Sequence, residues 1–290
     1  MTDGLKLSAV SLSAVPLSAV DAGAAAAAFN AAYENYVIPV SFTADALQRR
    51  MRADSVDPAS STVYLDGDRP VGLLLVARRG RTSRIAAVGF APALRGSGLG
   101  RRALEAAVSQ AGERRDDRIL LEVITGNAPA VALYRKLGFV VRRDLAGYRS
   151  PEDAGPQDVS LAEVDLDDAR SMLAAFSDDD LPWQLQPASF TAAAPTVRAL
   201  SLDDRAVALV DETAAGPRLL ALAVDPAERG RGLARRLLRA IAGRYPAGGV
   251  SIVAVVPERT GTPVFASAGW TRTGVGQHEM EHRLRSPATG

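Results

Sequence analysis

The chain repeats itself once along its 290 residues, and this repeat limits the fold more than any other feature. The segment VGFAPALRGSGLGRRALEAAV, which starts at Val88, returns as LAVDPAERGRGLARRLLRAIA, which starts at Leu222. A second pair follows in the same order, LLEVITGNAPAVALYRKLGF from Leu120 and SIVAVVPERTGTPVFASAGW from Ser251. The offsets of 134 and 131 residues are far longer than the roughly 20 to 50 residues of a solenoid repeat. We therefore expect two copies of one domain.

The first copy is expected to cover residues 5–149 and the second copy residues 158–287, with a linker at 150–157. The stretch from Arg149 to Pro156 is polar and contains two prolines and a glycine, which is typical of a connection between domains. The chain length agrees, because it is about twice the size of an average domain.

Each copy shows the same order of expected elements. Turn residues at 66–68 and 78–80 predict antiparallel hairpins, and Thr43 is a favourable helix N-cap. A strand–helix–strand–helix pattern follows. This order predicts an α/β (α+β) fold in which each copy has a mixed, mostly antiparallel central sheet flanked by helices. The other expected elements are strands at 12–17, 85–90, 119–124, 139–142 and near Tyr148, and helices at 21–36, up to 114, 128–137, 166–176 and 187–193.

Composition excludes several kinds of chemistry. The chain has no cysteine, which excludes disulfides, thiolate metal sites and cysteine nucleophiles and favours a reducing, cytoplasmic location. Thirty-four basic and thirty-three acidic residues leave a net charge of +1, so electrostatics gives no reason to expect nucleic acid or a membrane as partner. The two histidines, His278 and His282, lie in a stretch that alternates like a final strand, and we expect no metal site.

A glycine-rich loop, Arg95-Gly96-Ser97-Gly98-Leu99-Gly100, lies between an expected strand and an expected helix. Glycines allow positive φ angles and close approach of backbone N–H groups, and a helix N-terminus adds partial positive charge, so the loop is suited to a phosphate. The alternative is a tight connection without a ligand. The loop is not a Walker A motif, because arginines follow it in place of Lys and Ser or Thr. Its return at residues 229–234 favours the phosphate interpretation.

These motifs resemble the GCN5-related N-acetyltransferase (GNAT) superfamily. The resemblance depends on Arg-x-x-Gly-x-Gly/Ala after a strand, then a second strand, then Asn127 with Ala-Leu-Tyr-x-x-Leu-Gly-Phe. It extends over both copies and is closest at residues 88–139. The string Leu121-Glu122-Val123, with Asn127, is similar to the branch that acetylates protein N-termini in bacteria, although it recurs in acetyltransferases with other substrates.

The resemblance implies a tandem acetyl-CoA-dependent N-acetyltransferase. It implies that a primary amine attacks the acetyl thioester directly in a ternary complex, with coenzyme A as co-substrate and no metal. The acceptor would be a small-molecule amine or a peptide N-terminus, and the protein a monomer or homodimer. The cofactor-binding residues implied for the first copy are Val88 and Phe90 for the pantetheine, Arg95, Gly96, Ser97, Gly98, Leu99, Gly100 and Arg101 for the pyrophosphate, and Asn127 for the pantetheine again.

The chemistry needs a base for the incoming ammonium and an acid for the leaving thiolate. Glu122, in an otherwise apolar strand, is the candidate base, because burial would raise its pKa. The alternative is a structural glutamate paired with an arginine. Tyr134, whose hydroxyl is implied to lie near the thioester sulfur, is the candidate acid, and the alternative is a residue of the helix core.

The second copy departs from the pattern where chemistry would occur. At the 131-residue offset, Glu122 becomes Val253, Asn127 becomes Glu258 and Tyr134 becomes Phe265, which cannot donate a proton. The second copy is therefore expected to be degenerate, unless Ser267 or Glu258 takes over. A second cofactor site is implied at Leu222, Val224, Arg229, Gly230, Arg231, Gly232, Leu233 and Ala234.

The acceptor pocket of the first copy is expected at residues 33–40, and the acidic run at 177–180 is its counterpart in the second copy. Two other functions stay open. One is a non-catalytic acyl-CoA-binding sensor or scaffold, and the other is a tandem enzyme like mycothiol synthase with an active second copy. The identity of the amine, the acyl-chain preference and the oligomeric state are not readable from the sequence.

Overall fold

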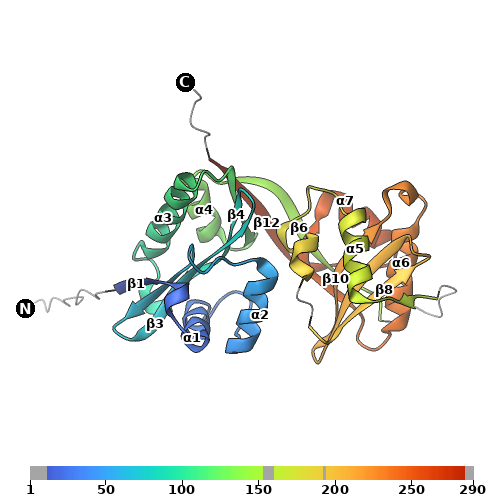
Figure 1. Cartoon of the computed structure of the whole chain (residues 1–290), viewed down its shortest axis with the longest axis horizontal. Coiled ribbons are helices and arrows are strands. Elements are labelled where there is room, and N and C mark those ends of the chain that lie inside the picture. Colours follow the sequence, from blue (N-terminus) through green and yellow to red (C-terminus); the bar gives the residue numbers. More distant parts are fainter. Residues whose placement is uncertain (1–11, 153–159, 192–193, 285–290) are drawn as a thin grey trace, which may run out of the picture. The chain divides into compact units, whose positions relative to one another are not determined.

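The computed structural model describes residues 12–152, 160–191 and 194–284 (Figure 1). The chain forms two compact units. The first contains Met1–Met51, Ser55–Leu121 and His282–Gly290, and the second contains Arg52–Asp54 and Glu122–Glu281. This division differs from the expected copies 5–149 and 158–287. Those bounds were drawn from the sequence repeat, and they stay a prediction. Most of the expected linker at 150–157 lies outside the described residues.

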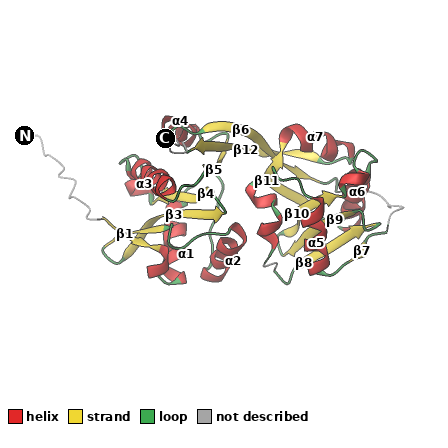
Figure 2. Cartoon of the chain, turned by 45° about the horizontal axis from the view of Figure 1, so that its top comes forward, coloured by secondary structure: helices red, strands yellow, loops and turns green. Residues whose placement is uncertain are grey.

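The first unit is built on a sheet whose pairs β1–β2, β2–β3 and β3–β4 are antiparallel and whose pair β4–β5 is parallel. Helices α1 and α2 lie on one face and α3 on the other (Figure 2). Strand β5 begins in the first unit and ends in the second. The elements are β1 (Leu12–Pro16), α1 (Ala22–Ala32), α2 (Ala44–Asp54), β2 (Thr62–Asp66), β3 (Arg69–Arg79), β4 (Thr82–Phe90), α3 (Leu99–Glu113) and β5 (Arg118–Ile124).

Local signals in the first unit act as expected. The side chain of Thr43 accepts a hydrogen bond from the backbone N–H of Ala46 (3.3 Å) and caps α2. Gly67 has a φ of +60°, which the tight turn between β2 and β3 requires. Phe29 of α1 and Leu47 of α2 are buried in one hydrophobic cluster with Leu73 of β3, and this cluster fixes both helices on the sheet.

In the second unit the end of β5 is followed across the sheet by β12, β6, β11, β10, β9, β8 and β7. Helix α5 packs on one face of β8–β10, and α6 and α7 pack on the other (Figure 1). The elements are α4 (Ala128–Lys136), β6 (Val140–Arg149), β7 (Ala162–Glu163), α5 (Leu166–Phe176), β8 (Val197–Leu202), β9 (Ala206–Thr213), β10 (Gly216–Val224), α6 (Leu233–Arg244), β11 (Ser251–Pro257), α7 (Glu258–Ser267) and β12 (Thr271–Arg283). The predicted fold class, a mixed, mostly antiparallel sheet flanked by helices, is confirmed.

The end of the first copy differs from the expectation of two short strands. Residues Val140–Arg149 form one strand, β6, and its neighbours β11 and β12 come from the second copy. The charged residues in the middle of this strand are paired with residues of β12. Arg142 and Arg143 both bind the buried carboxylate of Glu279 on β12, at 2.9 and 2.5 Å. His278, also on β12, lies 2.6 Å from Asp144, which confirms the histidine segment as a final strand.

The expected helix at 187–193 is also absent from the described part of that segment. Residues Pro187–Phe190 form a single 3-10 turn, and 192–193 lie outside the described residues. The turn is held by the Ser189 hydroxyl, which donates to the carbonyl of Trp183 (2.9 Å). Among the helices of residues 12–152, 160–191 and 194–284, none combines the length and hydrophobicity needed to cross a bilayer.

Gly147 of β6 lies between β11 and β12, where the register on both sides is irregular. A Cβ atom there would lie 2.7 Å from the Thr273 hydroxyl and 2.8 Å from the Ile252 carbonyl. We predict that Gly147→Ala lowers the free energy of unfolding by about 1–3 kcal/mol, the usual cost of overpacking, in urea titrations. Gly274→Ala is the control, since a Cβ there meets nothing within 4 Å, and equal losses in both variants would contradict the close approach.

Candidate functional site

The glycine loops of the two copies have the same backbone geometry. Gly96 and Gly98 have φ angles of +77° and +83°, and Gly230 and Gly232 have +79° and +81°. Gly98 is the N-cap of α3 and Gly232 is the N-cap of α6. A Cβ added at Gly96, Gly98 or Gly230 would meet nothing within 4 Å, so the space beside these backbones is open. Each loop therefore presents the first N–H groups of a helix to open space, as a phosphate cradle requires.

In both copies the strand before the loop separates from its parallel neighbour. Residues Thr82–Ile85 of β4 pair with β5, but the ladder ends there and a bulge follows at Ala86. In the second copy β10 pairs with β11 only at Arg218, and the matching bulge lies at Leu220. Bulges of this kind end strand pairing and change the direction of the strand. The predicted pantetheine residues Val88 and Phe90, and their counterparts Leu222 and Val224, all lie beyond these points.

The first arginine of each loop fastens the loop to the end of a helix. The guanidinium of Arg95 donates to the carbonyl of Phe90 (3.1 Å) and to the carbonyls of Ala32 and Glu34, at the end of α1. Arg229 repeats this arrangement with the carbonyls of Val224 (3.4 Å) and Phe176 (2.6 Å). The predicted contact of Arg95 with a pyrophosphate stays a prediction, because three carbonyls already hold this side chain. Sequence reasoning missed the anchoring role, although the recurrence of Arg at this position was the signal for it.

The remaining loop residues have local partners. The Ser97 hydroxyl donates to the carbonyl of Leu94 (2.6 Å). Arg101 forms an exposed ion pair with Glu105 (2.7 Å), and Arg231 forms one with Glu228 (2.9 Å). Exposed pairs of this kind are weak and screened, so these guanidinium groups can be drawn to a stronger anion.

The predicted residues of the first copy divide between the two units. Val88 to Arg101 lie in the first unit, and Glu122, Asn127 and Tyr134 lie in the second. Glu122 is half-buried on β5, between the buried side chains of Leu121 and Val123.

Asn127 is the N-cap of α4, and its side-chain oxygen accepts a hydrogen bond from the backbone N–H of Ala130 (3.3 Å). Tyr134 is a buried residue of α4 whose ring packs edge-on against Phe139. These contacts give both residues structural roles, and their roles toward coenzyme A stay predictions.

The segment expected to line the acceptor pocket begins at Tyr33, directly after α1. The Tyr33 ring stacks on Phe29 (4.4 Å between centroids) and lies edge-on to Tyr36 (5.0 Å). Burial raises the pKa of Tyr33 well above its ordinary value, the nearby Tyr36 adds to this rise, and a hydrogen bond between the hydroxyl and the Val88 backbone opposes it. Tyr33 therefore stays a neutral phenol beside the free end of β4.

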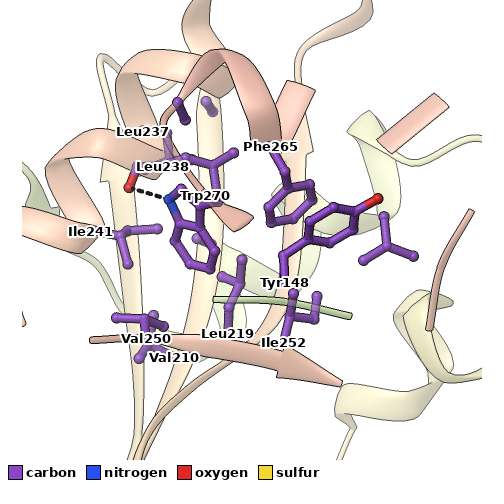
Figure 3. Close-up of a cluster of buried hydrophobic side chains, with 14 of the residues drawn as sticks. Tyr148, Val210, Leu219, Leu237, Leu238, Ile241, Val250, Ile252, Phe265 and Trp270 are labelled. Carbon is purple, nitrogen blue, oxygen red and sulfur yellow. Dashed lines mark hydrogen bonds between the residues drawn. The ribbon is translucent and has the colours of Figure 1, made fainter. Parts of the chain in front are cut away.

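The second unit contains a cavity of about 630 Å³ beside its own glycine loop. The cavity extends from Gly230 and Gly232 along β10 to the end of α5, and Phe265 contributes to its wall. Phe265 is stacked on Tyr148 (4.4 Å) and lies edge-on to Trp270, whose indole N–H donates to the Leu238 carbonyl (Figure 3). The substituted position is thus a well-packed part of the core.

The other substituted positions of the second copy are not among the residues that line this cavity. Val253 is 47% exposed, and the carboxylate of Glu258 is paired with Arg272 (3.0 Å). The acidic run at 177–180 is also engaged, because Asp178 pairs with Arg229 (2.7 Å) and Asp180 with Arg142. In the described part of the chain, His, Asp and Glu side chains form no group of three suited to a metal ion.

Comparison with known proteins defines the class of this fold. A GCN5-related N-acetyltransferase from Sphaerobacter thermophilus superposes with a TM-score of 0.68 at 17% identity, over 95% of this chain and 96% of that chain. A GCN5-related N-acetyltransferase from Kribbella flavida superposes with a TM-score of 0.60 at 15% identity, over 94% of this chain and 71% of that chain. A tandem GNAT protein from the clavulanic acid biosynthesis pathway superposes with a TM-score of 0.59 at 15% identity, over 95% of this chain and 100% of that chain. No curated protein matches the sequence. The chain has the tandem GNAT fold.

A family model matches most of the first copy. Residues 26–139 match the model of the acetyltransferase (GNAT) family. This match confirms, for residues 26–139, the resemblance drawn from the motifs, and the family that is matched uses acetyl-CoA.

The anchoring role of Arg95 gives a prediction for stability. Arg95→Ala leaves the carbonyls of Phe90, Ala32 and Glu34 without their charged donor, and we expect the free energy of unfolding to fall by about 1–3 kcal/mol in urea titrations. Arg102→Ala is the matched control on the exposed side of α3, with an expected change within about 0.5 kcal/mol. A loss for Arg95→Ala no larger than for the control would show that the loop is held by other contacts.

Proposed function

We propose that the protein is an acetyl-CoA-dependent N-acetyltransferase whose first copy transfers the acetyl group to a primary amine. The observation that carries this proposal is the end of the β4–β5 ladder at Ile85, directly before a loop with two positive-φ glycines and a helix start. Beyond Ile85 no parallel strand pairs with this edge of β4, so the amide-containing pantetheine arm could take the place of a strand there, with the Val88 backbone exchanging its bond to the Tyr33 hydroxyl for one to the arm. The match of residues 26–139 to an acetyltransferase family supports the same assignment.

The residues present fit coenzyme A. Backbone N–H groups from Gly96 to Gly100 would hold the pyrophosphate, helped by the partial positive charge of α3. Val88 and Phe90 would pair with the pantetheine through their backbones, and the Asn127 amide would meet it from the start of α4. Bound acetyl-CoA supplies the thioester, and the chain itself supplies binding, orientation and proton transfer.

In the proposed reaction the amine must lose one proton before it attacks. Glu122 would accept that proton from the ammonium, directly or through water, because a half-buried carboxylate on an apolar strand is a suitable base. The amine nitrogen then bonds to the acetyl carbon, and the bond from that carbon to sulfur breaks. The Tyr134 hydroxyl would give its proton to the leaving thiolate, and the second proton of the amine nitrogen, released as the amide forms, would pass through water to restore the Tyr134 phenol. Direct attack needs no acyl-enzyme, which agrees with a chain that has no cysteine.

The acceptor class proposed is a small-molecule amine or a peptide N-terminus. The segment that would receive it, residues 33–40, carries Tyr33, Glu34 and Tyr36, and a carboxylate near aromatic rings is suited to an ammonium group. A cytoplasmic location is proposed with it, because the chain has no cysteine to protect or to oxidise.

Removal of one hydroxyl tests the acid. Tyr134→Phe is expected to slow acetyl transfer by about 10²-fold or more, the usual contribution of general acid catalysis, with little change in coenzyme A affinity. The measurement is free-thiol release with an amine acceptor found by screening. Tyr245→Phe is the control. Tyr245 lies at the end of α6, where its hydroxyl donates to Glu212 of β9 (2.9 Å), and it takes no part in the proposed reaction. An unchanged rate for Tyr134→Phe would refute the assignment.

Bulk at the two glycine loops tests which copy is active. Both Gly98 and Gly232 need positive φ, so a valine strains either loop equally. We expect Gly98→Val to abolish turnover and Gly232→Val to leave it measurable, with urea titrations to confirm that both variants fold. Abolition by Gly232→Val alone would assign the chemistry to the second copy.

A further inference from the structure

The cavity in the second unit has charged groups at one end and apolar walls elsewhere. Its ionisable lining residues are Asp178, Glu228, Arg229 and Arg235, all beside the glycine loop or the end of α5. Asp178 is bound to Arg229, and Glu228 to Arg231. The rest of the wall is formed mainly by aliphatic and aromatic side chains, among them Leu173, Phe176, Leu181, Leu185, Leu219 and Phe265.

This lining cannot perform the chemistry proposed for the first copy. No histidine, tyrosine or lysine is among the described residues that line the cavity, and both carboxylates are engaged in ion pairs at its mouth. The hydroxyl of Ser267, a lining residue, already donates to the Val264 carbonyl (2.7 Å). An ammonium group placed against the apolar walls would lose its hydration without gaining a partner. The deep part of the cavity therefore suits an apolar group rather than an amine.

The difference between the copies can be followed to one position. Tyr33 and Ser177 are equivalent, because each directly follows the first long helix of its copy and donates its N–H to that helix. Each is also flanked by the groups that the loop arginine binds. In the first copy the Tyr33 hydroxyl reaches the backbone of Val88 on β4. In the second copy the short side chain of Ser177 lines the cavity together with Leu222, the counterpart of Val88.

The mouth of the cavity differs in charge from the loop of the first copy. Arg101 is neutralised by Glu105 one turn later in α3. Its counterpart Arg235 lines the cavity, and the residue one turn later in α6 is Arg239, a second cation. The guanidinium of Arg235 lies near Gly232, where a Cβ atom would be 3.6 Å from it. The start of α6 is thus more favourable for a polyanion than the start of α3.

We propose that the second copy binds a coenzyme A thioester with an apolar acyl group longer than acetyl, and retains it without transfer. The phosphates lie at Gly230 to Arg235, the pantetheine follows the free end of β10, and the acyl chain fills the apolar space beside Ser177. This inference rests on the proposed function, since it uses the same cradle for coenzyme A. It adds a second ligand class and assigns Ser177 as the residue that admits the longer chain.

The test compares octanoyl-CoA, acetyl-CoA and free coenzyme A by isothermal titration calorimetry on the full chain. Each buried methylene is worth about fourfold in affinity, so octanoyl-CoA should bind one site per chain at least about tenfold more tightly than coenzyme A. Ser177→Tyr should remove this gain and leave the affinity for free coenzyme A within about threefold. Ser171→Tyr is the matched control, because Ser171 is an exposed residue of α5 away from the cavity, and it should keep the gain.

Three results would overturn the inference. One is equal affinity for octanoyl-CoA and free coenzyme A, and another is a gain that persists in Ser177→Tyr. The third is release of free thiol from octanoyl-CoA, which would show transfer or hydrolysis in place of retention. Acetyl transfer measured on the same wild-type sample separates the two proposals. Transfer without tighter octanoyl-CoA binding removes this inference alone, whereas absence of any coenzyme A binding removes the proposed function as well.

Discussion

The parallel strands β4 and β5 stay paired for four residues and then separate, and the candidate site depends on this separation. A bulge at Ala86 ends the ladder, and the residues beyond it keep N–H and C=O groups that no neighbouring parallel strand satisfies. In the second copy, a bulge at Leu220 lies at the matching position of β10. Because a buried backbone needs hydrogen-bond partners, the free edge, the glycine loop and the helix start together form a surface that a thioester with an amide-containing arm would complete.

The two copies share the backbone geometry of the strand, the glycine loop and the helix start, but they differ in the side chains around it. The positive-φ glycines and the arginine anchors coincide in geometry, since the path of the chain depends on them. Ser177, Arg239 and Phe265 stand where the first copy has Tyr33, Glu105 and Tyr134. These changes alter the charge and the side-chain groups beside the glycine loop without altering the backbone geometry of the loop. In the two proposals above, they give one chain two sites of different chemistry.

The last strand of each copy is placed against the other copy's sequence. Within the second unit, β6 of the first copy lies between β11 and β12 of the second, and Tyr148 of β6 stacks on Phe265 in the core (Figure 3). The buried Glu279 of β12 is held by Arg142 and Arg143 of β6. A buried carboxylate without these partners would be costly, so the two strands depend on each other. The compact units therefore differ from the sequence copies.

The sequence by itself determined the duplication, the fold class, the glycine loops and most element boundaries. These features are local, because turn residues, helix caps and hydrophobic periodicity act over a few neighbours. Only the tertiary structure decided the placement of β6 and β12, since the partners of Arg142 and Asp144, Glu279 and His278, lie in a distant part of the sequence. The same holds for Arg95, since two of its three carbonyl partners, on Ala32 and Glu34, are about 60 residues away, and for the cavity beside Ser177. The volume of this cavity depends on side chains from several elements, so it cannot be predicted from any one segment of the sequence.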